Sequence, residues 1–311
     1  MEVQRLRRFY HCQHASDCYS VPQMKIRSLF LFSFFCLSAC GGNSSSESGP
    51  GTDACNLLSS RTKIINGTTC ETRKSPVFRI SIDGASCTGT LITPSQILTA
   101  AHCVYDISSE SKLRAGTISP AQMLVFEADS TLASALVTKV TAHPDFVNDF
   151  IRVSSVFDQS DTVGAFVSGV LSNGLADLAV LDLDRSLTAI PQPVQVSSSP
   201  LIGDNFGIFG FGATNGGAPF ATQSLNSGRM QVELVGRDNF TAVFRDGGSN
   251  TCFGDSGGPA LKTVGVPALF GTTALGSTTD CAPGEVSLFT LLSSPRLGNF
   301  IRQTAPLAEF Q

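Results

Sequence analysis

The residues best suited to chemistry in this sequence form one short run around a serine. The run, with glycine on both sides of the serine, is Cys252-Phe253-Gly254-Asp255-Ser256-Gly257-Gly258-Pro259. Glycine lets a tight turn expose one hydroxyl group and point backbone N–H groups at one position. Acyl transfer needs such N–H groups for its developing oxyanion. A serine hydroxyl is a weak nucleophile alone, so the run predicts covalent catalysis only if another segment supplies a base.

Two other runs could supply the base and a carboxylate. His102 follows a strand-like stretch, in Leu98-Thr99-Ala100-Ala101-His102-Cys103. Asp177 lies at the entry of a buried strand, in Ala176-Asp177-Leu178-Ala179-Val180-Leu181. Taken singly, such a histidine is more often a packed or surface residue, and such an aspartate a turn or cap residue. Together with the serine run they occur in the order His102, Asp177, Ser256.

The elements that must position these residues are predicted to be short strands. From Cys55 onward, short apolar runs alternate with turn residues and no long stretch has the helical period. Twelve runs are predicted as strands, at residues 77–82, 90–92, 97–101, 123–126, 136–141, 178–183, 206–211, 230–234, 241–245, 260–262, 268–273 and 286–291. We therefore expect an all-β fold of two barrels or sandwiches. Residues 295–303 are expected to form a closing helix, and residues 155–175 a long loop.

Composition limits the classes of protein. The 311 residues are 42% hydrophobic, enough for one large or two medium cores, and the net charge is −4. A weakly acidic chain does not favour nucleic acid as a partner. Ten cysteines are too many for a reducing cytosol unless they bind metal, and their spacings are not those of zinc ligands. We expect an exported β protein that uses no metal or other cofactor.

The segment before the folded part has the pattern of an export signal. Residues 24–27 include two basic residues, and residues 28–39 form an apolar run too short to span a bilayer. Residues 24–39 therefore predict a signal peptide, and its end, Leu37-Ser38-Ala39-Cys40, resembles the lipobox of bacterial lipoproteins. The resemblance implies a lipid on Cys40 and a membrane anchor, in the bacterial periplasm or at the cell surface. The alternative is an ordinary signal peptide followed by a chance cysteine.

Two flanking segments complete this region. Residues 1–23 are expected to come from an upstream start codon and to be absent from the mature product, because a signal peptide does not usually follow 23 polar residues. Their cluster of His11, Cys12, His14 and Cys18 leaves a metal site as the alternative. Residues 41–53 contain no apolar side chain to bury and predict a flexible tether.

The three chemical runs resemble the TAAHC, DIALL and GDSGGP motifs of the trypsin/chymotrypsin family of serine peptidases. The first and last are intact, and the middle one is the conservative version DLAVL. The resemblance covers residues 64–304 and implies two antiparallel six-stranded β-barrels, at about 64–185 and about 200–304, with a short C-terminal helix. It also implies a serine endopeptidase that acts on proteins or peptides.

The resemblance assigns a role to each chemical residue. Ser256 would attack the substrate carbonyl, His102 would carry its proton, and Asp177 would orient the histidine. The backbone N–H groups of Gly254 and Ser256 would form the oxyanion hole.

An activation site is implied by a further resemblance. Arg61-Thr62-Lys63-Ile64-Ile65-Asn66-Gly67 is similar to the family's cleavage site, except that Ile65-Asn66 replaces Val-Gly. An activating protease would cut after Lys63, and the new Ile64 ammonium would pair with Asp255. Residues 40–63 would then be a lipidated tether and propeptide. The alternative is a surface strand with basic neighbours.

The cysteines from residue 41 onward are even in number. The resemblance implies that Cys87 pairs with Cys103 and that Cys252 pairs with Cys281. Cys55 and Cys70 remain as a third pair, which would keep the propeptide attached after cleavage.

Substrate selection is expected to depend on Asn250 and Gly276. In the family, the residue six before the serine lies at the base of the specificity pocket, and here it is Asn250. A neutral amide favours a neutral or polar substrate side chain over lysine or arginine. Gly276 would leave the pocket mouth open, whereas the far wall near residues 284–287 cannot be aligned. Ala274 lacks the hydroxyl that usually supports the catalytic aspartate, unless Thr273 supplies one.

Other readings of the chain stay open. One is a binding lipoprotein that keeps the protease fold but is catalytically idle. An esterase on another fold is disfavoured, because those hydrolases usually carry G-x-S-x-G with the histidine last. His143 lies in a segment similar to the family's HPxY segment and is expected to be a surface-loop residue without a catalytic role.

Overall fold

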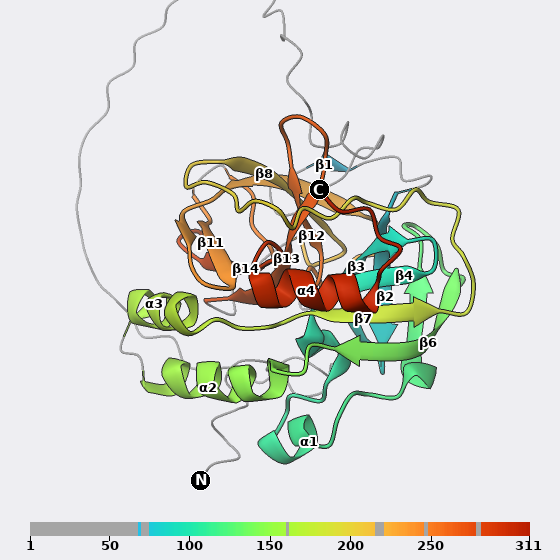
Figure 1. The fold of residues 1–311 in the computed structure, drawn as a ribbon, viewed down its shortest axis with the longest axis horizontal. Helices are drawn as coiled ribbons and strands as arrows, with labels where there is room; N and C mark the ends of the chain where they lie inside the picture. Colours follow the sequence, from blue (N-terminus) through green and yellow to red (C-terminus); the bar gives the residue numbers. More distant parts are fainter. Residues whose placement is uncertain (1–67, 70–74, 160–161, 215–220, 246–247, 278–280) are drawn as a thin grey trace, which may run out of the picture.

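The computed structural model describes residues 68–69, 75–159, 162–214, 221–245, 248–277 and 281–311 (Figure 1). The predicted signal peptide, tether and activation site lie outside these residues, and so do Cys40, Cys55 and Cys70. Within the described part of the chain, no helix is long and apolar enough to cross a membrane.

The first half of the described chain forms a closed antiparallel barrel with strand order β2-β3-β4-β7-β6-β5. Its strands are β2 (Val77–Ile82), β3 (Ala85–Thr93), β4 (Gln96–Thr99), β5 (Met123–Phe126), β6 (Ala135–Ala142) and β7 (Ala179–Leu183). Strands β4 and β7 pair antiparallel, with Thr99 opposite Ala179. Continuing β4 forward and β7 backward therefore leads to His102 and Asp177 on the same side of the barrel. The strand register brings these two residues together across 75 positions of sequence.

The second half forms a curled antiparallel sheet with strand order β1-β9-β8-β12-β13-β14-β11-β10. Its strands are β1 (Thr68–Thr69), β8 (Asn205–Gly210), β9 (Asn226–Gln231), β10 (Leu234–Val235), β11 (Asn239–Val243), β12 (Pro259–Lys262), β13 (Leu269–Gly276) and β14 (Val286–Leu291). The all-β prediction is confirmed. The sheet has eight strands where six were expected, because the two-residue strands β1 and β10 extend its edges.

Phenylalanines fill the interior of the second sheet. The ring of Phe206 lies 5.2 to 5.6 Å from those of Phe240, Phe270 and Phe289, in edge-to-face geometry. Such pairs add to the free energy of burial because the positive ring edge meets the negative ring face. This packed core holds the strands that carry the serine loop and its neighbours.

The helices are η4 (Ala101–Val104), α1 (Glu110–Arg114), η5 (Pro120–Gln122), α2 (Phe146–Gln159), α3 (Val163–Asn173) and α4 (Pro295–Thr304). Helix α4 confirms the predicted closing helix. It contributes Leu297, Phe300 and Ile301 to a core shared with residues of both sheets. The C-terminal helix therefore helps to fix the two halves relative to each other.

The prediction of a long loop at residues 155–175 is wrong, because α2 and α3 occupy most of it. Serine and glycine suggested a loop, but the apolar residues recur at helical spacing, and Phe166, Val167 and Val170 are buried. The Thr162 side chain caps α3 by accepting a hydrogen bond from the Ala165 N–H. Gly169 is needed for close packing, since a Cβ there would lie 2.5 Å from Cγ1 of Val156 on α2.

Arg296 on α4 joins helix α2 to the second sheet. Its guanidinium bonds Asp149 of α2 at 2.7 Å and Asp238 of the β10–β11 turn at 2.8 Å. Burial alone would lower the pKa of Arg296, but these bonds outweigh it and raise the pKa. His143 is buried beside this region and packs on Phe300 with ring centroids 5.0 Å apart, so its expected place on a surface loop is wrong.

Candidate active site

The clearest feature of the site is a buried pair formed by His102 and Asp177. His102 lies in η4, which follows β4, and Asp177 lies two residues before the start of β7. Nδ1 of His102 lies 2.6 Å from Oδ2 of Asp177, and the His102 backbone N–H donates to Oδ1 at 2.8 Å. A carboxylate facing Nδ1 keeps the proton on that nitrogen and leaves Nε2 as an acceptor. The histidine is therefore fixed in orientation and tautomer.

The aspartate itself is held by the second sheet. Asp177 is fully buried, and its backbone carbonyl accepts a hydrogen bond from the Thr290 hydroxyl on β14 at 3.1 Å. Neither Ala274 nor Thr273 bonds its carboxylate within the described part of the chain. A side-chain hydroxyl at position 273 or 274 is thus not used to support the aspartate here.

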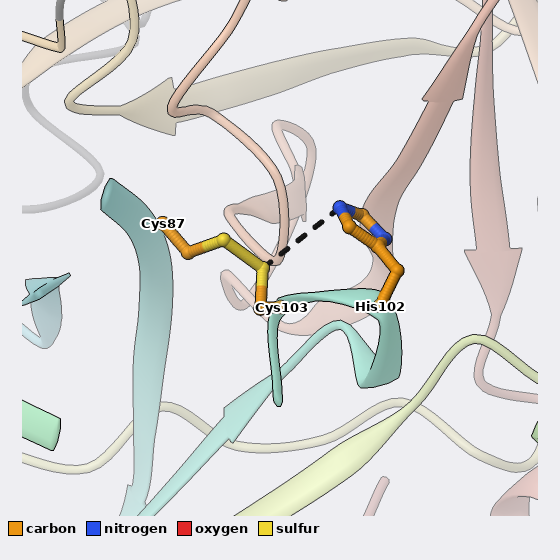
Figure 2. Close-up of side chains that lie close together, drawn as sticks. All are labelled: Cys87, His102 and Cys103. Carbon is orange, nitrogen blue, oxygen red and sulfur yellow. Dashed lines mark hydrogen bonds between the residues drawn. A yellow bond between two sulfur atoms is a disulfide. The ribbon is translucent and has the colours of Figure 1, made fainter. Parts of the chain in front are cut away.

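The serine loop is positioned against the first barrel by Thr88 on β3. The Thr88 N–H donates to the Ser256 carbonyl, and the Thr88 hydroxyl donates to the Gly254 carbonyl, both at 2.8 Å. The Ser256 carbonyl lies 3.8 Å from Sγ of Cys103. Nε2 of His102 lies 3.9 Å from the same sulfur (Figure 2). The structure therefore brings all three predicted catalytic segments to one place.

Two backbone amides of the serine loop remain available to a ligand. Within the described part of the chain, the N–H groups of Gly254 and Ser256 donate no hydrogen bond, whereas those of Asp255, Gly257 and Gly258 do. Gly254 has φ +99°, a conformation that L side chains rarely adopt, so glycine is required there. Two free N–H groups in one tight turn are what an anionic oxygen needs.

Asp255 is buried beneath the loop and receives two backbone hydrogen bonds. The N–H groups of Gly212 and Cys252 donate to its two carboxylate oxygens at 2.8 and 2.9 Å. Glycine is required at position 212, since a Cβ there would lie 2.4 Å from the carboxyl carbon of Asp255. Burial raises the pKa of Asp255 to about 7, and the two N–H groups oppose that shift only in part. Its predicted partner Ile64 and the cleavage residue Lys63 lie outside the described residues.

Two disulfides brace the site, and both match the predicted pairing. Cys87 is bonded to Cys103 and Cys252 to Cys281. The side chains of Cys87, His102 and Cys103 converge within 4.8 Å, a grouping that could suggest a metal site. Figure 2 shows the two sulfurs bonded to each other, so neither offers a thiolate to a metal ion. The predicted pair Cys55–Cys70 lies outside the described residues.

A cavity opens beside Ser256. Its walls are formed by Thr251, Cys252, Phe253, Ser256, Thr273, Ala274, Leu275, Gly276, Cys281 and Glu285. Gly276 lines it, as the sequence predicted, whereas Asn250 is fully buried behind the wall. The Asn250 amide nitrogen donates to Oε2 of Glu285 at 2.7 Å, and its amide oxygen accepts from the Ser287 hydroxyl at 2.8 Å.

Glu285 is the residue of this cavity that sequence reasoning missed. It lies in the segment that could not be aligned, directly before β14. The sequence did carry a signal that Glu285 lines the pocket. This glutamate lies beside a strand-like run and four residues after Cys281, which was predicted to brace the pocket. Only the folded chain shows its carboxylate beside Asn250.

The fold and site define an all-β protein in which a buried histidine–aspartate pair lies beside a glycine-flanked serine. A family model described as Trypsin matches residues 64–295. The chain is 27% identical to tonin of Rattus norvegicus over 244 residues, or 75% of this chain and 86% of tonin. It is 27% identical to kallikrein-1 of Mus musculus over 82% of this chain and 93% of that protein. For kallikrein 1-related peptidase b22 of Mus musculus the identity is 28%, over 78% and 89%. The chain belongs to the trypsin family of serine peptidases.

Proposed function

We propose that this protein is a serine endopeptidase that cleaves proteins or peptides through an acyl-enzyme. The observation that carries the proposal is the buried pair of His102 and Asp177, 2.6 Å apart, beside the glycine-flanked Ser256. Membership of a serine peptidase family supports the same conclusion.

In the proposed reaction, Oγ of Ser256 bonds to the substrate carbonyl carbon while its proton passes to Nε2 of His102. The carbonyl oxygen becomes an oxyanion that accepts hydrogen bonds from the N–H groups of Gly254 and Ser256. Asp177 stabilises the imidazolium. The tetrahedral intermediate then expels the amine, which takes its proton from His102. Water attacks the acyl-enzyme by the same route, so the carboxylic acid leaves and Ser256 is regenerated.

A fluorophosphonate probe tests the nucleophile directly. We expect stoichiometric labelling of processed protein, complete loss in Ser256→Ala, and no change in Ser155→Ala, which removes an exposed hydroxyl on α2. Hydrolysis of a peptide library should follow the same pattern. Absence of both labelling and hydrolysis in processed, folded protein would refute the proposal and favour a catalytically idle binding protein with this fold.

We also propose that the enzyme is made as a zymogen activated by cleavage after Lys63. The buried, uncompensated position of the Asp255 carboxylate supports this, because an Ile64 ammonium would give it a charged partner. Lys63→Gln should block processing and activity, whereas Arg61→Gln should leave both intact. Full activity of the Lys63→Gln protein without cleavage would contradict the idea. Non-reducing mass spectrometry of the processed form would show one linked species if Cys55 pairs with Cys70.

Export and lipid attachment remain proposals drawn from the sequence. Residues 24–39 would direct export, Cys40 would carry the lipid, and the mature chain would be tethered to a membrane. Incorporation of labelled fatty acid in a bacterial host should be lost in Cys40→Ser and kept in a variant of a nearby tether residue, Ser44→Ala. Labelling that survives Cys40→Ser would exclude this anchor.

A further inference from the structure

The short segment that leads to Asp177 lies outside the strand ladder of the barrel. Pairing of β7 with β4 and β6 begins only at Ala179, so residues 174–176 depend on other groups for their backbone hydrogen bonds. Because Asp177 directly follows this segment, the path of the segment affects where the Asp177 carboxylate meets Nδ1 of His102. The groups that hold residues 174–176 therefore bear on the geometry of the buried pair.

Two side chains of the inserted helix α2 supply part of these bonds. Oδ2 of Asp149 accepts a hydrogen bond from the Ala176 N–H at 3.1 Å, and the Arg152 guanidinium donates to the Gly174 carbonyl at 2.8 Å. Asp149 and Arg152 are three residues apart and lie on the same face of the helix. One helix face therefore holds the segment at two points.

The Asp149 carboxylate is itself fixed by two cations. Arg152 donates to its Oδ1 at 2.6 Å, and Arg296 of α4 donates to its Oδ2 at 2.7 Å. Asp149 is buried, and charge-assisted hydrogen bonds of this length are among the stronger ones in proteins. The acceptor for the Ala176 N–H thus has a defined position relative to both helices.

We propose that Asp149 is a positioning residue for the reaction, which fixes the backbone before Asp177 so that its carboxylate stays aligned with His102. This inference rests on the proposed peptidase function. Asn239 of β11 bonds both backbone groups of Leu175, so loss of Asp149 should loosen the segment without freeing it. Loosening lowers the rate because a misplacement of about 1 Å can cost roughly 100-fold.

Asp149→Ala in the processed enzyme tests the role directly. We expect kcat to fall about 10- to 100-fold. KM should change little, since Asp149 does not line the cavity beside Ser256. Titration of active sites with a fluorophosphonate keeps unfolded protein out of the measured kcat.

Asp145→Ala is the matched control. It removes another carboxylate from Arg296, whose guanidinium lies 3.0 Å from Oδ2 of Asp145. Within the described residues, this carboxylate makes no hydrogen bond to the segment before Asp177. The control should therefore keep the wild-type kcat. Equal losses of kcat in Asp149→Ala and Asp145→Ala would overturn the inference.

Asp149→Asn separates the hydrogen bond from the charge. Its amide oxygen can still accept from the Ala176 N–H and from Arg296. Its NH2 group would face Arg152, whose side chain is 41% exposed and can turn toward water. We expect kcat to stay within about threefold of wild type. A loss as large as that in Asp149→Ala would exclude this hydrogen bond as the cause.

Proton NMR of the His102 Nδ1–H reports on the buried pair without turnover. Its resonance should shift or broaden in Asp149→Ala and keep its wild-type position in Asp145→Ala. An unchanged resonance in Asp149→Ala would refute the positioning role. If that variant fails to fold, Arg152→Met removes the bond to the Gly174 carbonyl from a half-exposed site and should lower kcat at least about threefold. Unchanged kcat and resonance in Arg152→Met would then refute it.

The same measurements distinguish the two ways of failing. If wild-type protein is neither labelled by the fluorophosphonate nor active on peptides, but the His102 resonance depends on Asp149, the positioning role stands and the peptidase function fails. If wild-type protein is active and Asp149→Ala alters neither kcat nor the resonance, the peptidase function stands and the positioning role fails.

Discussion

Replacing Asp255 with asparagine in the unprocessed chain should remove a large pH dependence from the stability of the protein. The Asp255 carboxyl is 1% exposed, and burial raises its pKa to about 7 from its usual value of 3.8. The folded chain therefore holds a proton between these two pH values that the unfolded chain has released. The extra proton stabilises the folded state most below about pH 4. This contribution of Asp255 to the unfolding free energy is lost as the pH rises through about 7.

The size of the effect follows from the difference between the two pKa values. Three pH units at about 1.4 kcal/mol each correspond to roughly 4 kcal/mol of unfolding free energy. Asparagine has nearly the same shape and no charge, so the variant should lack this dependence. It should also carry a constant cost of about 1–3 kcal/mol, because its NH2 group would face a backbone donor at Gly212 or Cys252.

The assay is urea unfolding between pH 4.5 and 8.5 with disulfides intact. Both proteins should carry Lys63→Gln and Ser256→Ala, so that neither processing nor self-digestion occurs. The difference in unfolding free energy between them should change by roughly 3 kcal/mol across this range, in favour of asparagine at high pH, because pH 4.5 already lies above the usual pKa of 3.8. Parallel profiles, within about 1 kcal/mol, would refute the account of Asp255 as an uncompensated buried acid. In processed wild-type protein, pairing with the Ile64 ammonium should reverse the trend.

Three further predictions concern the site and its support. Asp177→Asn should lower kcat about 10⁴-fold with little change in KM, measured by steady-state kinetics, since the histidine would lose its tautomer control; a loss below tenfold would contradict this. Gly212→Ala should destabilise the fold by several kcal/mol in urea unfolding, because its Cβ would overlap a buried carboxylate, whereas Gly164→Ala should be close to neutral. Arg296→Met should lower the unfolding free energy by about 3 kcal/mol, because it removes the cation that hydrogen-bonds buried Asp238 and one of the two that hydrogen-bond Asp149; an unchanged urea midpoint would show that the cluster is solvated.

The strand pattern of this protein could be predicted locally, since each of the twelve predicted runs overlaps an observed strand. The runs 77–82, 123–126 and 286–291 match observed strands at both ends, because their apolar residues alternate or cluster in short blocks between turns. The first four residues of β9, 226–229, were not predicted. Its polar residues form a strand because β8 supplies hydrogen-bond partners, which no local pattern reveals.

The sequence by itself determined the chemical groups: a serine between glycines, a histidine beside a cysteine, and an aspartate before a buried strand. These are local strings, and the turns and strands that they require are set by neighbouring residues. Tertiary structure decided what depends on distant partners. It formed helices α2 and α3 where serine and glycine suggested a loop, because their apolar faces could be buried against each other and the barrel. It also placed Glu285 beside Asn250, 35 residues away, because the start of β14 lies against the serine loop. The acidic wall of the pocket is therefore a property of the folded chain, since hydrogen bonds across the sheet create it.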